Sequence, residues 1–237
     1  VKVDKIDDGR RDLERLLKKV VMIVRAMRVY QWPKNLLVLI ALVFAAQVHH
    51  PEKIIQAGVA FFSFCLAASA TYLFNDWRDR EKDRAHPTKC TRPQASGEMP
   101  PWLAWVLIVL LFAGSIRLGL ALPLAFMATL GFYILLTLSY TLLLKDIIIL
   151  DVMAVSLGFV ARALAGAVAI DVKFSNWLMV CTLFAALFLS LCKRRRELIL
   201  LEDDAEGHRQ VLSEYSVTYL DQLILIGEAA ARFAAAA

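Results

Sequence analysis

The chain lacks the residues that would cross-link or metallate a small secreted fold. It has four cysteines in 237 residues and no Cys-x-x-Cys pair. Cys65, Cys181 and Cys192 fall in or at the end of apolar runs, and Cys90 lies in a basic loop. Neither a disulfide framework nor a zinc site is therefore expected.

The sequence also lacks a soluble second domain, a short internal repeat and a cleavable signal peptide, since the N-terminus is charged. Its four histidines form no catalytic pair with neighbouring residues. Nothing around His86 indicates a triad, so we expect this histidine to be structural. No nucleic-acid partner is expected.

Apolar residues, by contrast, are abundant. They make up 59% of the chain, and uncharged runs repeatedly reach the length that crosses a bilayer. The sequence therefore predicts an all-α fold, a polytopic transmembrane bundle of about seven helices. The expected spans lie near residues 30 to 48, 54 to 74, 101 to 120, 122 to 144, 147 to 170 and 174 to 192, with a seventh from near Thr218.

Two regions are expected. Residues 1–28 place leucines and valines at helical spacing with basic residues between them, which is typical of an amphipathic helix lying in the membrane surface. A soluble helix packed on the cytoplasmic loops is the alternative. Residues 29–237 form the transmembrane catalytic region, and its alanine-rich end indicates truncation at the C-terminus.

Basic residues predict the orientation. The N-terminal segment and the loops after the second, fourth and sixth spans hold almost all the Lys and Arg outside the spans, whereas the opposite side has only Lys53, Arg117 and Lys173. Because basic loops stay in the cytoplasm, we expect the N-terminus and these three loops there. They would line one cytoplasm-facing cavity.

A dense charged cluster follows the 21 uncharged residues 54–74. If the helix continues, Asn75, Asp79 and Asp83 share one face at four-residue spacing. Crowded carboxylates repel one another unless a cation lies between them, and few hard oxygen ligands suit Mg²⁺. A solvated helix end with ordinary surface ion pairs remains the alternative.

The loop that follows is basic and framed by turn residues. Pro87 should end the helix, and Pro93 and Gly97 should fix a turn. Lys89 and Arg92 would then bind a phosphate opposite the metal. A positive-inside anchor explains their charge equally well.

The fifth span holds two charged residues within the membrane. Asp151 and Arg162 are eleven residues apart and so lie on one helix face. A charge in the bilayer is costly unless it faces a partner or a wet cavity. Substrate binding and a structural interhelical contact both remain open, since small residues around Arg162 permit close helix approach.

The acidic stripe, the Lys89-x2-Arg92-Pro93 turn and the Tyr140-to-Lys145 loop resemble the UbiA intramembrane prenyltransferase superfamily. Within it, the chain is most similar to the decaprenyl-phosphate phosphoribosyltransferases. The segments that carry this likeness are Gln31 to Asn35, which includes Lys34, Asp83 to Lys89 and Gly158 to Gly166. The resemblance implies nine transmembrane helices in the full fold, a Mg²⁺ cofactor and a bacterial plasma-membrane location.

One departure from the superfamily separates its subgroups. Members that prenylate aromatic rings carry a second acidic motif after the sixth span, where this chain has Lys193, Arg194, two further arginines and Glu197. A basic segment suits a further phosphate group. A stop-transfer cluster would account for some of these charges.

The resemblance thus implies transfer of 5-phosphoribose from phosphoribosyl pyrophosphate to a polyprenyl phosphate, in the synthesis of cell-envelope arabinan precursors. Prenyl transfer to an aromatic or lipid acceptor and transport of an anionic solute are the alternatives. Membrane lipids would contact the spans, and a homo-oligomer is also open. The expected metal ligands and catalytic residues are Asn75, Asp79 and Asp83, and the expected substrate-binding residues are Lys34, Lys89, Arg92, Tyr140, Lys145, Asp151, Arg162, Lys193, Arg194 and Glu197.

Overall fold

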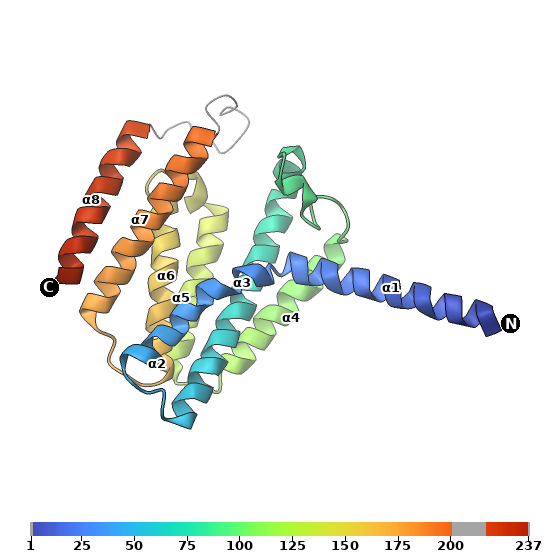
Figure 1. Ribbon diagram of the computed structural model, residues 1–237, viewed down its shortest axis with the longest axis horizontal. Helices are drawn as coiled ribbons and strands as arrows, with labels where there is room; N and C mark the ends of the chain where they lie inside the picture. Colours follow the sequence, from blue (N-terminus) through green and yellow to red (C-terminus); the bar gives the residue numbers. More distant parts are fainter. Residues whose placement is uncertain (1, 201–216, 237) are drawn as a thin grey trace. The chain divides into compact units, whose positions relative to one another are not determined.

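Helices make up every regular element in the described part of the chain, residues 2–200 and 217–236 of a computed structural model (Figure 1). The all-α prediction is therefore confirmed. The elements are α1 (Lys2–Ala26), η1 (Val29–Leu39), α2 (Ile40–Phe44), α3 (Pro51–Ala85), η2 (Lys89–Thr91), α4 (Pro101–Gly119), α5 (Leu124–Leu142), η3 (Leu144–Asp146), α6 (Leu150–Ala169), α7 (Asn176–Leu200) and α8 (Val217–Ala236), where η denotes a 3-10 helix.

Five of the described helices, α3 to α7, are long and apolar enough to cross a membrane. Two of them begin with a proline, Pro51 in α3 and Pro101 in α4. Proline suits a first helical position, because its fixed φ is already helical and it lacks only an N–H that would have no partner there. Because five helices have the length and composition of membrane spans, the chain is a multi-pass membrane protein.

The first predicted span takes a different form from the others. It consists of the 11-residue 3-10 helix η1, which contains Pro33, followed by the five-residue α2. A 3-10 helix rises about 2.0 Å per residue, more than an α-helix does, so it covers more length with the same number of residues. Val29–Phe44 is nevertheless a shorter apolar segment than the five helices long enough to cross a membrane.

The chain forms two compact units. The first comprises residues 1–32 and 66–113, and the second comprises residues 33–65 and 114–237. In the first unit, the end of α1, the second half of α3 and most of α4 pack around a small apolar core that includes Ala26, Leu73 and Ile108. This core anchors α3, which carries Asp76, Asp79 and Asp83, here called the acidic cluster.

In the second unit, α5, α6, α7 and α8 follow one another as neighbours (Figure 1). η1 and α6 approach at Gly166, where an added Cβ atom would lie 1.8 Å from the carbonyl oxygen of Val38. Only glycine allows that contact. Between α3 and α4, Ser63 and Ser115 donate hydrogen bonds to each other's backbone carbonyls at 2.9 and 2.8 Å. Small and hydroxyl side chains of this kind bring membrane helices close together.

Candidate functional site

The acidic cluster stands on the last turns of α3. This helix continues without a break through Ala85, two residues before Pro87, so the helical continuation predicted from the sequence is confirmed. Asp76 and Asp83 are two turns apart on one face, and each residue is only 4% exposed. Buried carboxylates require partners.

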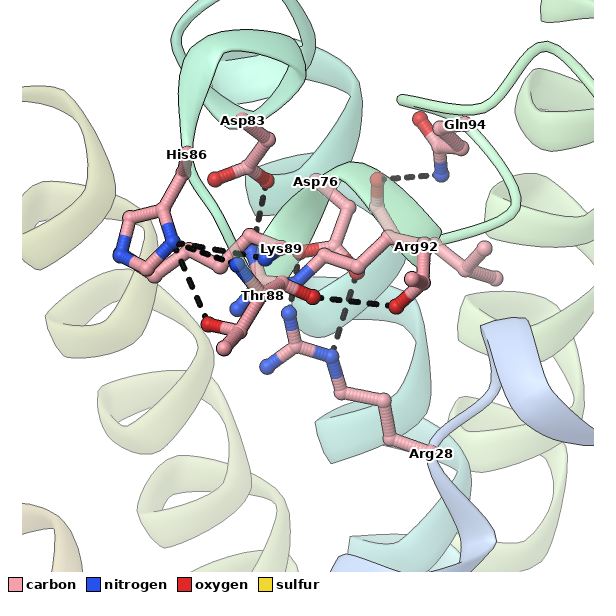
Figure 2. A network of polar contacts seen from close by, with 10 residues as sticks. Arg28, Asp76, Asp83, His86, Thr88, Lys89, Arg92 and Gln94 are labelled. Carbon is pink, nitrogen blue, oxygen red and sulfur yellow. Dashed lines mark hydrogen bonds and ion pairs between the residues drawn. The ribbon is translucent and has the colours of Figure 1, made fainter.

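Arg92 connects these two carboxylates (Figure 2). Its Nη1 donates to Asp76 Oδ1 at 3.1 Å and to Asp83 Oδ2 at 2.6 Å. The expected role of Arg92 was to bind a phosphate, but here its guanidinium is paired with acids. The two carboxylates point toward the same nitrogen atom, so a positive charge lies between them.

Arg28 holds Asp76 from the other side. Its Nε donates to Asp76 Oδ2 at 3.1 Å and its Nη2 pairs with Oδ1, a bidentate contact (Figure 2). Its guanidinium also lies 5.2 Å from the centre of the Tyr72 ring. Arg28 lies between α1 and η1 with a φ of 52°, in the left-handed region, so the chain turns sharply where it delivers this side chain.

Sequence reasoning missed both Asp76 and Arg28 as site residues. A signal for Asp76 was present, because residues seven apart on an α-helix point within about 20° of each other, closer than the roughly 80° between Asn75 and Asp83. No comparable signal marked Arg28, which pairs across 48 positions.

The other predicted members of the cluster lie nearby in the first unit. Asn75 and Asp79 on α3 and Lys89 on η2 are half-buried, and Asp79 and Lys89 take part in interactions of their own. No three Asp, Glu, His or Cys side chains in residues 2–200 and 217–236 gather into a metal-binding group. The predicted stripe is thus not a complete cage of protein ligands.

The donor set nevertheless fits Mg²⁺. Asp76 and Asp83 offer hard carboxylate oxygens directed at one point. Mg²⁺ is commonly held by one or two carboxylates together with water and substrate phosphates. A two-carboxylate site of this kind needs no third acidic ligand from the protein.

Hydrogen bonds from side chains to backbone carbonyls hold the loop that carries Arg92. Gln94 Nε2 donates to the carbonyl of Leu73 at 3.0 Å, and Arg84 Nε donates to the carbonyl of Ala95 at 3.1 Å. Gly97 has a φ of 83°, which glycine adopts without strain. The turn that the sequence indicated is present.

His86 Nδ1 accepts hydrogen bonds from the backbone N–H groups of Thr88 and Lys89 at 3.2 and 3.4 Å (Figure 2). It therefore supports the start of the loop just after α3 ends, which agrees with the structural role expected for it.

A second polar cluster lies in the second unit. Asp151, at the start of α6, is fully buried, and its Oδ2 accepts from Arg194 Nε of α7 at 2.7 Å. Asp151 Oδ1 also accepts the backbone N–H of Val152 at 2.7 Å. Arg194 was expected to bind substrate, whereas here it neutralises an acid between two helices.

Arg162 has different partners from Asp151, although both lie on α6. Its Nε donates to Asn35 Oδ1 at 2.7 Å, Nη1 donates to the carbonyl of Gly158 at 2.7 Å, and Nη2 donates to the Tyr133 hydroxyl at 2.9 Å. The guanidinium also stacks 4.7 Å from the Tyr133 ring centre. Arg162 is thus an interhelical anchor, and three of its five N–H groups are used within the protein.

The remaining predicted substrate-binding residues also belong to the second unit. Lys34 and Lys193 are exposed, Tyr140 is half-buried and Lys145 is buried within η3. The side chain of Glu197 lies outside the described part. The expectation that these residues and the acidic cluster line one cavity stays a prediction.

The five apolar spans, with charged side chains buried at their ends and within them, define a polytopic α-helical membrane protein with a polar site. The chain belongs to the UbiA prenyltransferase family, whose model matches residues 36–234.

Curated relatives are similar over most of this chain. It is 41% identical to decaprenyl-phosphate phosphoribosyltransferase from Mycolicibacterium smegmatis, over 84% of this chain and 64% of that protein. It is 40% identical to the enzyme of the same name from Corynebacterium glutamicum, over 83% of this chain and 60% of that protein. The chain thus spans less than two thirds of the length of either relative.

Solved structures share the fold. A UbiA homolog from Archaeoglobus fulgidus, determined with GPP and Mg²⁺ bound, superposes with a TM-score of 0.72 at 18% identity, covering 90% of this chain and 77% of that chain. The predicted UbiA-type bundle is therefore confirmed. Mg²⁺ occurs in a structural neighbour of this family.

Proposed function

We propose that the protein transfers 5-phosphoribose from phosphoribosyl pyrophosphate to a polyprenyl phosphate and releases pyrophosphate. The observation that carries this proposal is the 40 to 41% identity to two relatives named decaprenyl-phosphate phosphoribosyltransferase. Within the basic segment, Arg194 and Arg195 pair with Asp151 and Asp221. The exposed Lys193 and Arg196 support the proposal, because the reaction brings two phosphorylated substrates together.

The acidic cluster is the proposed donor site. Asp76 and Asp83, with Asp79 and Asn75 beside them on α3, would hold Mg²⁺ and the pyrophosphate of the donor. Bound there, Mg²⁺ would stabilise the negative charge that develops on the leaving group. Arg92 and Lys89 would share that charge as hydrogen-bond donors.

The transfer step forms one bond and breaks another at C1 of the ribose. An oxygen of the lipid phosphate attacks C1, and the bond from C1 to the pyrophosphate oxygen breaks with its electron pair leaving on pyrophosphate. A phosphate is already ionised near neutral pH, so the step needs no general base. This agrees with the structural role of His86.

Residues of the second unit are the proposed contacts for the remaining phosphates. Lys34, Tyr140, Lys145 and Lys193 are candidates, and Arg162 retains two N–H groups beyond those it uses within the protein. In this proposal, Arg194 contributes mainly by pairing with Asp151.

A second candidate is prenyl transfer, which the family description favours. It would use the same acidic cluster for a prenyl pyrophosphate. The basic residues from Lys193 to Arg196, in place of a second acidic motif, count against it.

A substrate assay separates the two reactions. Purified protein with Mg²⁺ should convert phosphoribosyl pyrophosphate and a long polyprenyl phosphate into a phosphoribosylated lipid, detected by mass spectrometry together with pyrophosphate release. It should form no product from a prenyl pyrophosphate and an aromatic acid, and a chelator should stop the first reaction. Product from the prenyl pyrophosphate alone would reject the phosphoribosyl assignment.

We also propose that α1 lies in the membrane surface. Its leucines and valines between Leu13 and Val24 are 46% to 60% exposed. Arg15, Lys18 and Lys19 lie among them and are exposed as well. An exposed apolar stripe flanked by bases fits an anionic lipid surface.

The proposed orientation places the N-terminus and the acidic cluster in the cytoplasm. A single cysteine at Thr88 should then react with a membrane-impermeant reagent only from the cytoplasmic side, and one at His50 only from the opposite side. Both positions are exposed. The native cysteines, above all Cys90, have to be removed first. Reversed labelling would place the cluster on the wrong side for a soluble donor.

A further inference from the structure

Arg92 is the one described side chain bonded to both buried carboxylates of the acidic cluster. The side chains of Asp76 and Asp83 are 5% and 6% exposed, and that of Arg92 is 26% exposed. Water therefore reaches the arginine more readily than the acids. Arg92 is thus the more exposed member of this arrangement.

The charges of the cluster balance in the protein alone. Asp76 and Asp83 contribute two negative charges, and Arg28 and Arg92 contribute two positive ones. A divalent cation added between the carboxylates would meet the Arg92 guanidinium at that same point. Like charges at such short range repel strongly in a partly buried site, so both cannot stay there.

A pocket beside the cluster offers Arg92 another place. Arg25, Arg28, Arg92 and Asp76 line this cavity of about 150 Å³. Arg28 and Arg92 pair with Asp76, whereas Arg25 pairs with Glu98 and donates to the carbonyl of Thr91. If a cation neutralises Asp76, the pocket becomes more positive. A phosphate group is then its natural ligand, because guanidinium binds phosphate oxygens through paired hydrogen bonds.

We propose that Arg92 takes the place of a divalent cation between Asp76 and Asp83 in the cation-free protein, and that cation binding transfers its guanidinium to a phosphate in the adjoining pocket. The phosphate half of this proposal rests on the proposed function, and the cation half does not. The exchange makes cation and phosphate binding cooperative, since each removes the obstacle to the other. It also keeps two buried acids neutralised when no substrate is present.

The test measures Mn²⁺ binding, as a spectroscopic substitute for Mg²⁺, by electron paramagnetic resonance on the purified full chain without substrate. Arg92→Gln should bind Mn²⁺ about tenfold more tightly than the parent protein, because the competing charge is gone. With Mn²⁺ saturating, the same variant should bind pyrophosphate about tenfold more weakly. A purely structural role for Arg92 would weaken both.

Lys82→Gln is the matched control. Lys82 is exposed on the same end of α3, next to Asp83 in sequence, so its replacement removes one nearby positive charge without opening the space between the carboxylates. Its Mn²⁺ affinity should change by less than about threefold. Asp83→Asn should lose most Mn²⁺ binding.

Arg92→Lys covers the case in which Arg92→Gln fails to fold. Lysine keeps the charge but has a single ammonium group in place of the planar fork, so we expect parent-like Mn²⁺ affinity and weakened pyrophosphate binding. Mn²⁺ binding by Arg92→Gln that is weaker than, or equal to, that of the parent would overturn the exchange. If the Mn²⁺ affinities are as expected but the parent protein does not transfer phosphoribose, only the proposed function is rejected.

Discussion

Replacing Asp83 with asparagine is expected to lower turnover by about three orders of magnitude while leaving the protein folded. The substitution removes a charge from the proposed cation site, where it would act on the leaving group. Asparagine has nearly the same shape and still offers Arg92 an acceptor oxygen, and Asp76 continues to pair with both arginines. Initial rates of pyrophosphate release measure the effect, and a thousandfold loss corresponds to about 4 kcal/mol in the activation free energy.

Asp79→Asn should have a similar effect on rate, and Lys82→Gln serves as the control with parent-like turnover. Thermal unfolding in detergent should place Asp83→Asn close to the parent protein. Asp76→Asn should differ by losing stability as well, because Arg28 would then lose its charged partner. Near-parent rates for both Asp79→Asn and Asp83→Asn would mean that the cluster is only a helix end held by ion pairs.

Arg194→Ala should destabilise the protein by about 3 to 5 kcal/mol, the usual cost of removing one member of a buried ion pair. Asp151 is fully buried, and Arg194 is its charged partner from α7. The loss should therefore show as a lower thermal unfolding midpoint in addition to lower activity. Lys193→Ala, at the exposed neighbouring position, should lower the midpoint by much less than Arg194→Ala and should mainly alter substrate use.

A double variant distinguishes pairing from substrate binding by Arg194. Asp151→Asn combined with Arg194→Gln removes both charges, so much of the stability lost in Arg194→Ala should return. Activity should return in part if Arg194 acts through Asp151. A stable Arg194→Ala protein that has lost only its affinity for one phosphorylated substrate would contradict the structural role and restore the role first expected for this arginine.

Periodicity and composition predicted most of the fold, because the helices are long and apolar, and two of them begin with a proline. The first span is the exception. Pro33 and the neighbouring residues form a 3-10 helix there, and hydrophobicity does not distinguish a 3-10 helix from an α-helix. The length of α7 was also underestimated, since Lys193 to Arg196 continue the helix beyond its apolar part.

The candidate site was predictable where its residues are close in sequence. Asp83 and the turn at Gly97 could be identified from spacing and residue type. The pairings could not, because Arg28 meets Asp76 across 48 positions and Arg194 meets Asp151 across 43. A basic residue in a loop has many potential acidic partners, and only the packing of the helices selects one. For that reason Arg92 and Arg194, both expected to bind substrate, prove to be paired with acids.

The close contact at Gly166 determines which partner the side chain of Arg162, one helical turn away, can bind. Arg162 precedes Gly166 by four residues on α6, and Asn35 precedes Val38 by three on η1, so the touching backbones and the 2.7 Å bond between Asn35 and Arg162 belong to the same seam. A methyl group at position 166 would push the two backbones apart by more than 1 Å and stretch that bond beyond hydrogen-bonding range. The lack of a side chain at Gly166 thus determines where the buried guanidinium of Arg162 lies in the membrane.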